Sequence, residues 1–127
     1  MATINVTMDT LDDVLSKNDI VLIDFWAEWC GPCKMFGPVF EKSSENHPDI
    51  AHLKVNTEED QQLAAAFGIQ SIPTLAIFRE KIMIYKQPGA LPESGLEDII
   101  KQIKELDMEK IKAEVEAQKE EAEATAE

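Results

Sequence analysis

Long apolar stretches are absent from this chain of 127 residues, although 44% of the residues are hydrophobic. A membrane-spanning helix needs about 20 consecutive apolar residues, so we expect no transmembrane segment. The opening residues, MATINVTMDT, also lack a basic stretch followed by an apolar one, and they lack an arginine-rich, acid-free composition. The sequence therefore predicts a cytoplasmic protein with no signal or transit segment.

Basic residues are scarce as well, because 12 Lys and Arg stand against 25 Asp and Glu for a formal net charge of -13. A surface of this sign repels nucleic-acid phosphates and anionic lipid headgroups. We therefore expect neither nucleic acid nor a membrane surface as a partner.

Cysteine is the third scarcity, since the chain has two and both lie in Cys30-Gly31-Pro32-Cys33. One pair three residues apart does not make a structural disulfide framework. A chain that places its only thiols in such a pair is typical of redox or metal chemistry.

Hydrophobic periodicity predicts alternating strands and helices, with the strands recognised by short β-branched or apolar runs. The resulting order βαβαβαββα predicts an α/β fold, with a mostly parallel sheet between two helical layers and a closing antiparallel hairpin. The expected strands are Thr3–Val6, Ile20–Trp26, Ala51–Asn56, Thr74–Arg79 and Ile82–Lys86, and the expected helices are Asp9–Lys17, Pro32–Asn46, Glu58–Phe67 and Pro92–Leu106.

Composition changes after Leu106, which suggests one domain over residues 1–106 and a tail over 107–127 with eight acidic and three basic residues. Met108, Ile111 and Val115 extend a helical stripe, but the last residues have almost nothing to bury. We expect a solvated, frayed helix, and a helix that docks on a partner remains the alternative.

The cysteine pair lies between an apolar strand and a helix, and this position indicates its chemistry. Side chains three residues apart on a helical turn lie on the same side, so a disulfide closes with little backbone movement. Cys30 is at the helix start, where free amides and the helix dipole favour a thiolate. Cys30 is therefore the predicted nucleophile, and Cys33, one turn in and more covered, is the predicted resolving thiol.

A zinc site is the competing interpretation, because Cys30 and Cys33 are followed by His47 and His52 at a spacing that fits a loose two-Cys, two-His rule. A zinc finger needs a hairpin around the cysteines and both histidines on one helix. Here a helix follows the cysteines directly and Pro48 separates the histidines. We therefore expect no metal, and we expect the histidines at the surface or its boundary.

Asp24 is the one charged residue in the apolar run Ile20–Trp26. Burial of a lone carboxylate is costly and raises its pKa, which is typical of acid-base work. A hydrogen-bonded structural acid is the alternative.

Together, WCGPCK after DFWAEW and GIQSIPTLAIF some forty residues later resemble the thioredoxin family over residues 3–106. The resemblance implies the thioredoxin fold, disulfide exchange between Cys30 and Cys33, and a reductant, since Gly31-Pro32 between the cysteines is typical of reducing members. It implies that Asp24 accepts the Cys33 proton and that Lys54 is its partner, although a lysine snorkelling to the surface remains open. It also places a cis-proline segment at Ile72-Pro73-Thr74 and a client-docking rim at Trp29, Gly89 and Ala90, with a packed aromatic as the alternative for Trp29.

Two positions depart from the family pattern. Arg79-Glu80-Lys81 stands where a hairpin glycine is usual, which leaves the turn conformation open. Pro88 replaces a small apolar residue before Gly89 and removes an amide donor.

We therefore predict a monomeric protein-disulfide reductase without a cofactor of its own, recycled by an NADPH-linked thioredoxin reductase and acting on disulfide-containing client proteins. The alternative is a binding module of the same fold that acts as an adaptor through the acidic tail.

Overall fold

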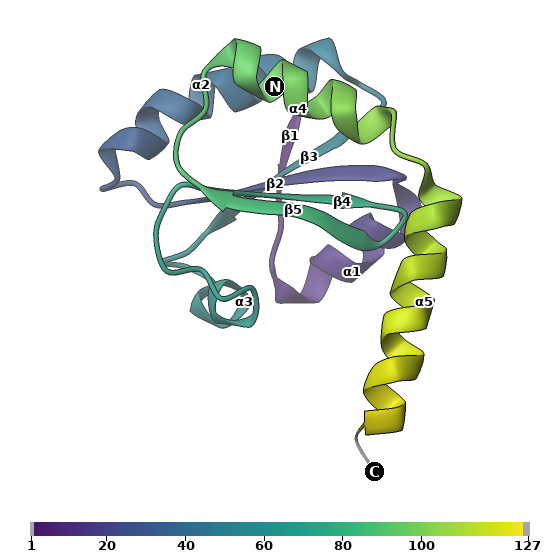
Figure 1. Ribbon diagram of the computed structural model, residues 1–127. Coiled ribbons are helices and arrows are strands. Elements are labelled where there is room, and N and C mark those ends of the chain that lie inside the picture. The colour runs from purple at the N-terminus through teal and green to yellow at the C-terminus, as the bar shows by residue number, and fades with distance from the viewer. Residues whose placement is uncertain (1, 126–127) are drawn as a thin grey trace.

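The computed structural model describes residues 2–125, which form a five-stranded mixed sheet with helices on both faces (Figure 1). The strand order is β1-β3-β2-β4-β5, in which β1, β3 and β2 are parallel and β4 is antiparallel to both of its neighbours. The predicted α/β fold is confirmed, and its antiparallel part also includes the β2–β4 pair. The elements are β1 (Thr3–Asn5), α1 (Met8–Lys17), β2 (Ile20–Trp26), α2 (Gly31–Asn46), β3 (Ala51–Asn56), α3 (Gln61–Ala66), β4 (Thr74–Arg79), β5 (Ile82–Pro88), α4 (Glu93–Lys104) and α5 (Met108–Thr125).

Strand β2 is buried on both faces, as its continuous apolar run predicts. Leu22 packs with Phe36 of α2 and Ile100 of α4 in one apolar layer. Ile23 packs with Leu11 of α1 and Leu63 of α3 in the other. The helices α2 and α4 therefore cover one face of the sheet and α1 and α3 the opposite face (Figure 1).

Helix α3 is shorter than predicted, because side chains before it take over its amide donors. The Asn56 side-chain oxygen accepts bonds from the amides of Glu58 and Glu59. The Asp60 carboxylate then accepts from the Leu63 amide at 3.0 Å and caps the helix. Such local bonds offer the backbone an alternative to the helix, so α3 begins at Gln61 and not at residue 58.

The β4–β5 turn keeps a left-handed conformation without glycine, since φ is 50° at Glu80 and 69° at Lys81. Two residues with positive φ make the type I′ turn that suits a hairpin. The Glu80 amide donates to the Asp19 carbonyl at 2.8 Å, and the Glu80 carboxylate pairs with Lys112 of α5. Contacts with other elements thus hold a turn that the sequence left open.

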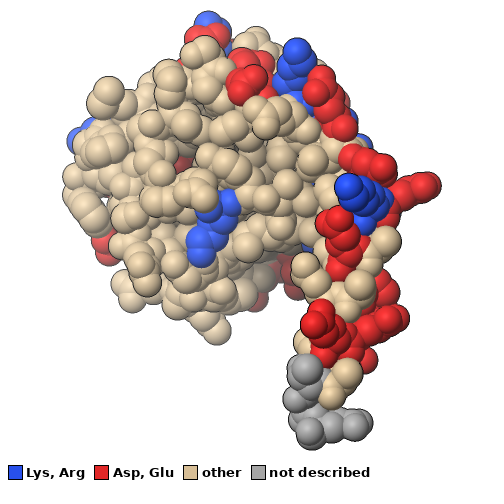
Figure 2. All heavy atoms as spheres, viewed as in Figure 1, with Lys and Arg blue, Asp and Glu red and all other residues tan. Residues whose placement is uncertain are grey.

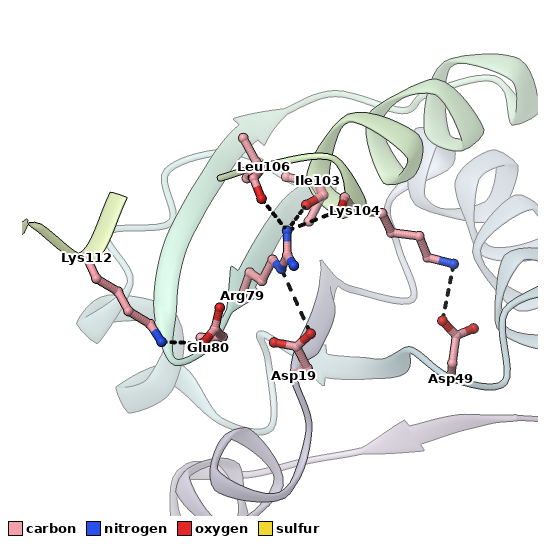
Figure 3. Close-up of polar contacts among 8 residues, drawn as sticks. All are labelled: Asp19, Asp49, Arg79, Glu80, Ile103, Lys104, Leu106 and Lys112. Carbon is pink, nitrogen blue, oxygen red and sulfur yellow. Dashed lines mark hydrogen bonds and ion pairs between the residues drawn. The ribbon is translucent and has the colours of Figure 1, made fainter. Parts of the chain in front are cut away.

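Arg79 at the end of β4 joins the hairpin to the last turn of α4 (Figure 3). Its Nη1 donates to the carbonyl oxygens of Ile103, Lys104 and Leu106 at 2.8, 3.3 and 3.1 Å. The last carbonyls of an α-helix lack the usual amide donor four residues later, so a guanidinium at the end of α4 is a suitable cap. The chain turns at this point, and α4 and α5 are two separate helices.

Helix α5 carries a dense set of acidic side chains (Figure 2). Met108 is buried, and Ile111 and Val115 are half-buried, while the residues from 116 to 124 are exposed. The helix lies beside the β4–β5 turn, which follows Arg79, the partner of the first residue of β2 (Figure 1). Helix α2, in contrast, begins after the last residue of β2. The acidic helix and the cysteine pair are therefore at opposite ends of the sheet. Within residues 2–125, no helix is both long enough and apolar enough to span a membrane.

Candidate active site

Cys30 forms the N-cap of α2, directly after the loop that leaves β2. Its backbone is extended, with φ -88° and ψ 112°, and its Sγ accepts a hydrogen bond from the Cys33 amide at 3.2 Å. Gly31 and Pro32 fill the first helical turn, where a proline loses no intrahelical bond. The sulfur of Cys30 therefore lies at the positive end of a helix of 16 residues.

Cys30 and Cys33 form a disulfide across a Cα separation of 5.2 Å, as the resemblance implied. The predicted difference in their exposure is wrong, since the exposed fractions are 4% and 5%. The cause is the loop before β4, which covers Cys30 so closely that the Ile72 carbonyl oxygen lies 3.5 Å from Sγ. The two sulfurs differ in surroundings instead: Cys30 faces Ile72, and Cys33 lines a cavity on the side of Lys54.

The segment 72–74 lies against the cysteine pair and contains a cis bond between Ile72 and Pro73. The Gly89 amide donates to the Pro73 carbonyl at 2.8 Å, and the Thr74 hydroxyl donates to the Ser71 carbonyl at 2.6 Å. Gly89 has φ 111°, a conformation that other residues rarely adopt. Gly89, the residue after β5, therefore holds this segment in place, and Ala90 follows as an exposed residue.

Pro88 is the last residue of β5 and pairs with Thr74. The hydrogen bond to the Pro73 carbonyl is donated by the amide of Gly89. The lack of an amide hydrogen at Pro88 therefore leaves this bond intact.

Trp29 is 69% exposed, so the interpretation as a packed aromatic is wrong. Its indole Nε1 donates to the Glu58 carboxylate at 2.6 Å, which fixes the ring over the start of the β3–α3 loop. A groove of about 540 Å³ runs from Trp29 past Ala64 of α3 to Ile72. An apolar surface with a few polar groups thus borders the cysteine pair.

Asp24 is 1% exposed at the centre of β2, and neither of its carboxyl oxygens has a hydrogen-bond partner within residues 2–125. No residue from 2 to 125 therefore supplies the hydrogen bond on which the interpretation as a structural acid depends. Burial raises the pKa of Asp24 from 3.8 to about 7, and the positive charge of Lys54 opposes this rise. A carboxyl with this pKa gains and loses a proton at neutral pH.

Lys54 is the β3 residue directly opposite Asp24 in the parallel β2–β3 ladder. Residues in register point to the same face of a sheet, so both side chains lie on the side covered by α2. The Lys54 ammonium group lies 4.9 Å from the centre of the Trp26 ring, and the side chain is half-buried. Lys54 is therefore a charged neighbour of Asp24 that forms no hydrogen bond with it.

The two histidines form hydrogen bonds with other residues and not with the cysteine pair. His47 contacts Glu97 of α4 at 2.7 Å, and His52 contacts the Ser43 hydroxyl at 2.9 Å and the Ile50 carbonyl at 3.1 Å. The predicted boundary position is wrong for His52, which is 1% exposed, and burial lowers its pKa. Within residues 2–125, no group of three or more His, Cys, Asp or Glu side chains is placed to hold a metal ion.

Glu41 is a residue of this region that sequence analysis missed. It lies on α2 and lines the same cavity as Cys33 and Lys54. Its Oε1 accepts a hydrogen bond from the Thr3 hydroxyl, and its Oε2 is buried without a partner within residues 2–125. A glutamate on an amphipathic helix carries no sequence signal for such a position.

Comparison with known proteins places this geometry in a family. The thioredoxin family model matches residues 2–102. A relative from Streptomyces coelicolor described as a putative thioredoxin 2 is 51% identical over 121 residues, which cover 95% of this chain and 90% of the relative. A thioredoxin from Porphyra purpurea is 40% identical over 102 residues, or 79% of this chain and 95% of the relative.

Among solved structures, a mutant thioredoxin from Halobacterium salinarum matches with a TM-score of 0.77 at 41% identity, over 82% of this chain and 92% of that one. The fold, the position of Cys30 and Cys33 and these similarities agree. The chain belongs to the thioredoxin family.

Proposed function

We propose that this protein-disulfide reductase uses Cys30 as the attacking sulfur and Cys33 as the resolving sulfur. The observation that supports this assignment is the N-cap position of Cys30. A thiolate there is stabilised by the positive end of α2 and by the Cys33 amide, which already donates to this sulfur. Cys33 lies within the first turn of α2, so its sulfur is not at the N-cap and lacks this stabilisation.

The reaction then has two exchanges. The Cys30 thiolate attacks one sulfur of a client disulfide, forms a mixed disulfide and releases the first client thiolate. Cys33 loses its proton, attacks the Cys30 sulfur and releases the second client thiolate, so the Cys30–Cys33 disulfide forms. Two electrons pass to the client, and an external dithiol donor returns them to the cysteine pair.

Asp24 supplies the proton acceptor for the second exchange. Asp24 lies on β2, the buried strand that leads to α2 and Cys33. Its pKa of about 7 lets the carboxylate accept a proton near neutral pH. Lys54, opposite Asp24 in the ladder, favours the charged form and limits the effect of burial. Both roles extend the family assignment to particular residues.

The client binds along Trp29, Ile72-Pro73-Thr74, Gly89 and Ala90. The Ile72 carbonyl beside the Cys30 sulfur is an acceptor for the amide of an extended client segment. The groove between Trp29 and Ile72 offers apolar surface to the residues that flank the client disulfide.

Thioredoxin-family proteins act on disulfide-containing clients and are reduced by thioredoxin reductase. For this chain we propose an NADPH-linked thioredoxin reductase as the donor, a monomeric state and a cytoplasmic location. A net charge of -13 argues against nucleic acids and anionic membranes as partners.

Replacement of the buried acid, Asp24→Asn, should stabilise the fold in a pH-dependent way. Because the folded pKa of about 7 exceeds the ordinary value of 3.8, the parent has its full stability below pH 4 and loses part of it as pH rises towards 7. Urea unfolding should show a gain for the variant of roughly 2–4 kcal/mol at pH 8 and much less at pH 4.

The exposed change Asp12→Asn is the control and should alter stability little at either pH. An equal gain for Asp24→Asn at pH 4 and pH 8 would contradict a buried acid of raised pKa.

The two cysteines should give opposite results when each is replaced by serine. Cys33→Ser keeps the nucleophile without a resolving partner, so mixed disulfides with clients accumulate and dithiol releases them. Cys30→Ser should trap few clients or none. Non-reducing electrophoresis of proteins captured by each variant measures the difference.

Both variants should lose multiple-turnover reduction. An adaptor would instead hold its partners noncovalently, so equal capture by both variants that dithiol does not release would support the adaptor and contradict the reductase assignment.

We propose that residues 1–106 contain the whole catalytic unit, since α5 lies at the opposite end of the sheet from Cys30. A chain that ends at Leu106 keeps every carbonyl that Arg79 caps and loses the buried Met108 and the Lys112–Glu80 pair. Truncation should therefore reduce stability by about 1–2 kcal/mol and leave insulin reduction with thioredoxin reductase and NADPH within about twofold of the parent rate. A much larger loss of activity in the folded truncated chain would show that the tail takes part in catalysis.

A further inference from the structure

Glu41 places a second carboxyl group beside the buried part of the active site. The residue lies on α2, two turns after Cys33, and its Oε1 is held by the Thr3 hydroxyl of β1. Its Oε2 is buried and has no hydrogen-bond partner within residues 2–125. Burial of a carboxylate oxygen without a hydrogen bond is costly. A nearby positive charge offsets part of this cost.

A cavity of about 590 Å³ connects this carboxyl group with Cys33 and Lys54. The charged and titratable groups that line the cavity are Cys33, Lys34 and Glu41 from α2, Lys54 from β3 and Glu28 from the loop between β2 and α2. Lys34 and Glu28 are exposed and hydrated, whereas Lys54 is half-buried. His52, on the same side of β3, is bonded to Ser43 and contributes no positive charge at neutral pH because burial lowers its pKa. Lys54 is therefore the partly desolvated cation that shares this cavity with Glu41.

Lys54 also faces Asp24, which lies opposite it in the β2–β3 ladder. The oxygens of Asp24 have no hydrogen-bond partner, and the Lys54 ammonium group is seated over the Trp26 ring. The cation thus has a carboxyl group on β2 and another on α2, and it is bonded to neither Asp24 oxygen nor to Glu41 Oε2. A second cavity beside Lys54 is lined by Glu59, which is exposed, and by Asp60, whose carboxylate accepts from the Met8 and Leu63 amides.

We propose that Glu41 is a positioning residue for the resolving exchange: its carboxylate shares the Lys54 ammonium group with Asp24 and so keeps Asp24 an effective proton acceptor near neutral pH. The proposal rests on the assigned role of Asp24. A Lys54 charge directed wholly at Asp24 would favour its ionised form and weaken it as a base. A second anion on α2 attracts part of the Lys54 charge, and it also repels the Asp24 carboxylate. Both effects favour the protonated form of Asp24.

The test compares the full-length chain with Glu41→Gln, in which the isosteric amide still accepts from Thr3 but carries no charge. Carbon NMR of Asp-labelled, oxidised protein follows the titration of the Asp24 carboxyl, and insulin reduction from pH 5.5 to 9 follows kcat. We expect the Asp24 midpoint to fall by about 0.5 unit or more, as expected for loss of one nearby charge in a partly buried site, and the acid limb of kcat to move with it. Glu45→Gln makes the same charge change at an exposed position of α2. Because solvent screens a charge at that position, this variant should move the Asp24 midpoint and the acid limb of kcat by less than about 0.1 unit.

A double variant tests the route through Lys54. In a Lys54→Met background, Glu41→Gln should shift the Asp24 midpoint by less than half as much as in the parent. An unchanged midpoint in Glu41→Gln, an equal shift in Glu45→Gln, or a full shift that persists without Lys54 would each overturn the proposal.

The assigned role of Asp24 is tested separately by the rate at which Asp24→Asn resolves a preformed mixed disulfide. A parental rate in that variant would remove Asp24 from the reaction, while the Asp24 titration would still report whether Glu41 acts on it through Lys54.

Discussion

The N-cap of α2 is made by the Cys30 sulfur, and the arrangement of the active site depends on this placement. Strand β2 is fixed by β3 and β4 on its two edges, and only three residues separate its end from Cys30. The register that pairs Phe25 with Thr74 brings segment 72–74 to the same end of the sheet. One strand therefore sets the direction of the helix, the position of the sulfur and the surface against which a client lies.

The same strand carries a buried carboxyl group, which the fold retains at a cost in stability. The folded protein would be more stable with a neutral residue at position 24, since burial without a hydrogen bond raises the pKa of Asp24 to about 7. That pKa suits a group that must accept a proton when Cys33 attacks, so the cost and the chemistry have one origin. Lys54 of β3 lies opposite this group in the β2–β3 ladder, and Glu41 of α2 lines the cavity that Lys54 also lines.

The sequence predicted the features that depend on local pattern and missed those that depend on distant neighbours. The bounds of β2, β3 and β4 follow from apolar runs, because packing on both faces requires them. The start of α3 was wrong because Asn56 and Asp60 compete for its amides, and His52 was misplaced because its partner Ser43 comes from α2. Burial of Cys30 by Ile72 and the orientation of Glu41 arise from segments far apart in the chain, so no local pattern indicates them. The docking role of residues 72–74 came from family resemblance rather than from periodicity.

The central claim is that the helix start makes Cys30, and not Cys33, the nucleophilic sulfur even though both are equally covered in the disulfide form. The direct measurement is brief alkylation of the fully reduced chain with less than one equivalent of iodoacetamide at pH 7, followed by mass spectrometry of the peptides. Because thiolates react and thiols do not, we expect the label almost entirely on Cys30. Equal labelling of both cysteines, or preference for Cys33, would contradict the account.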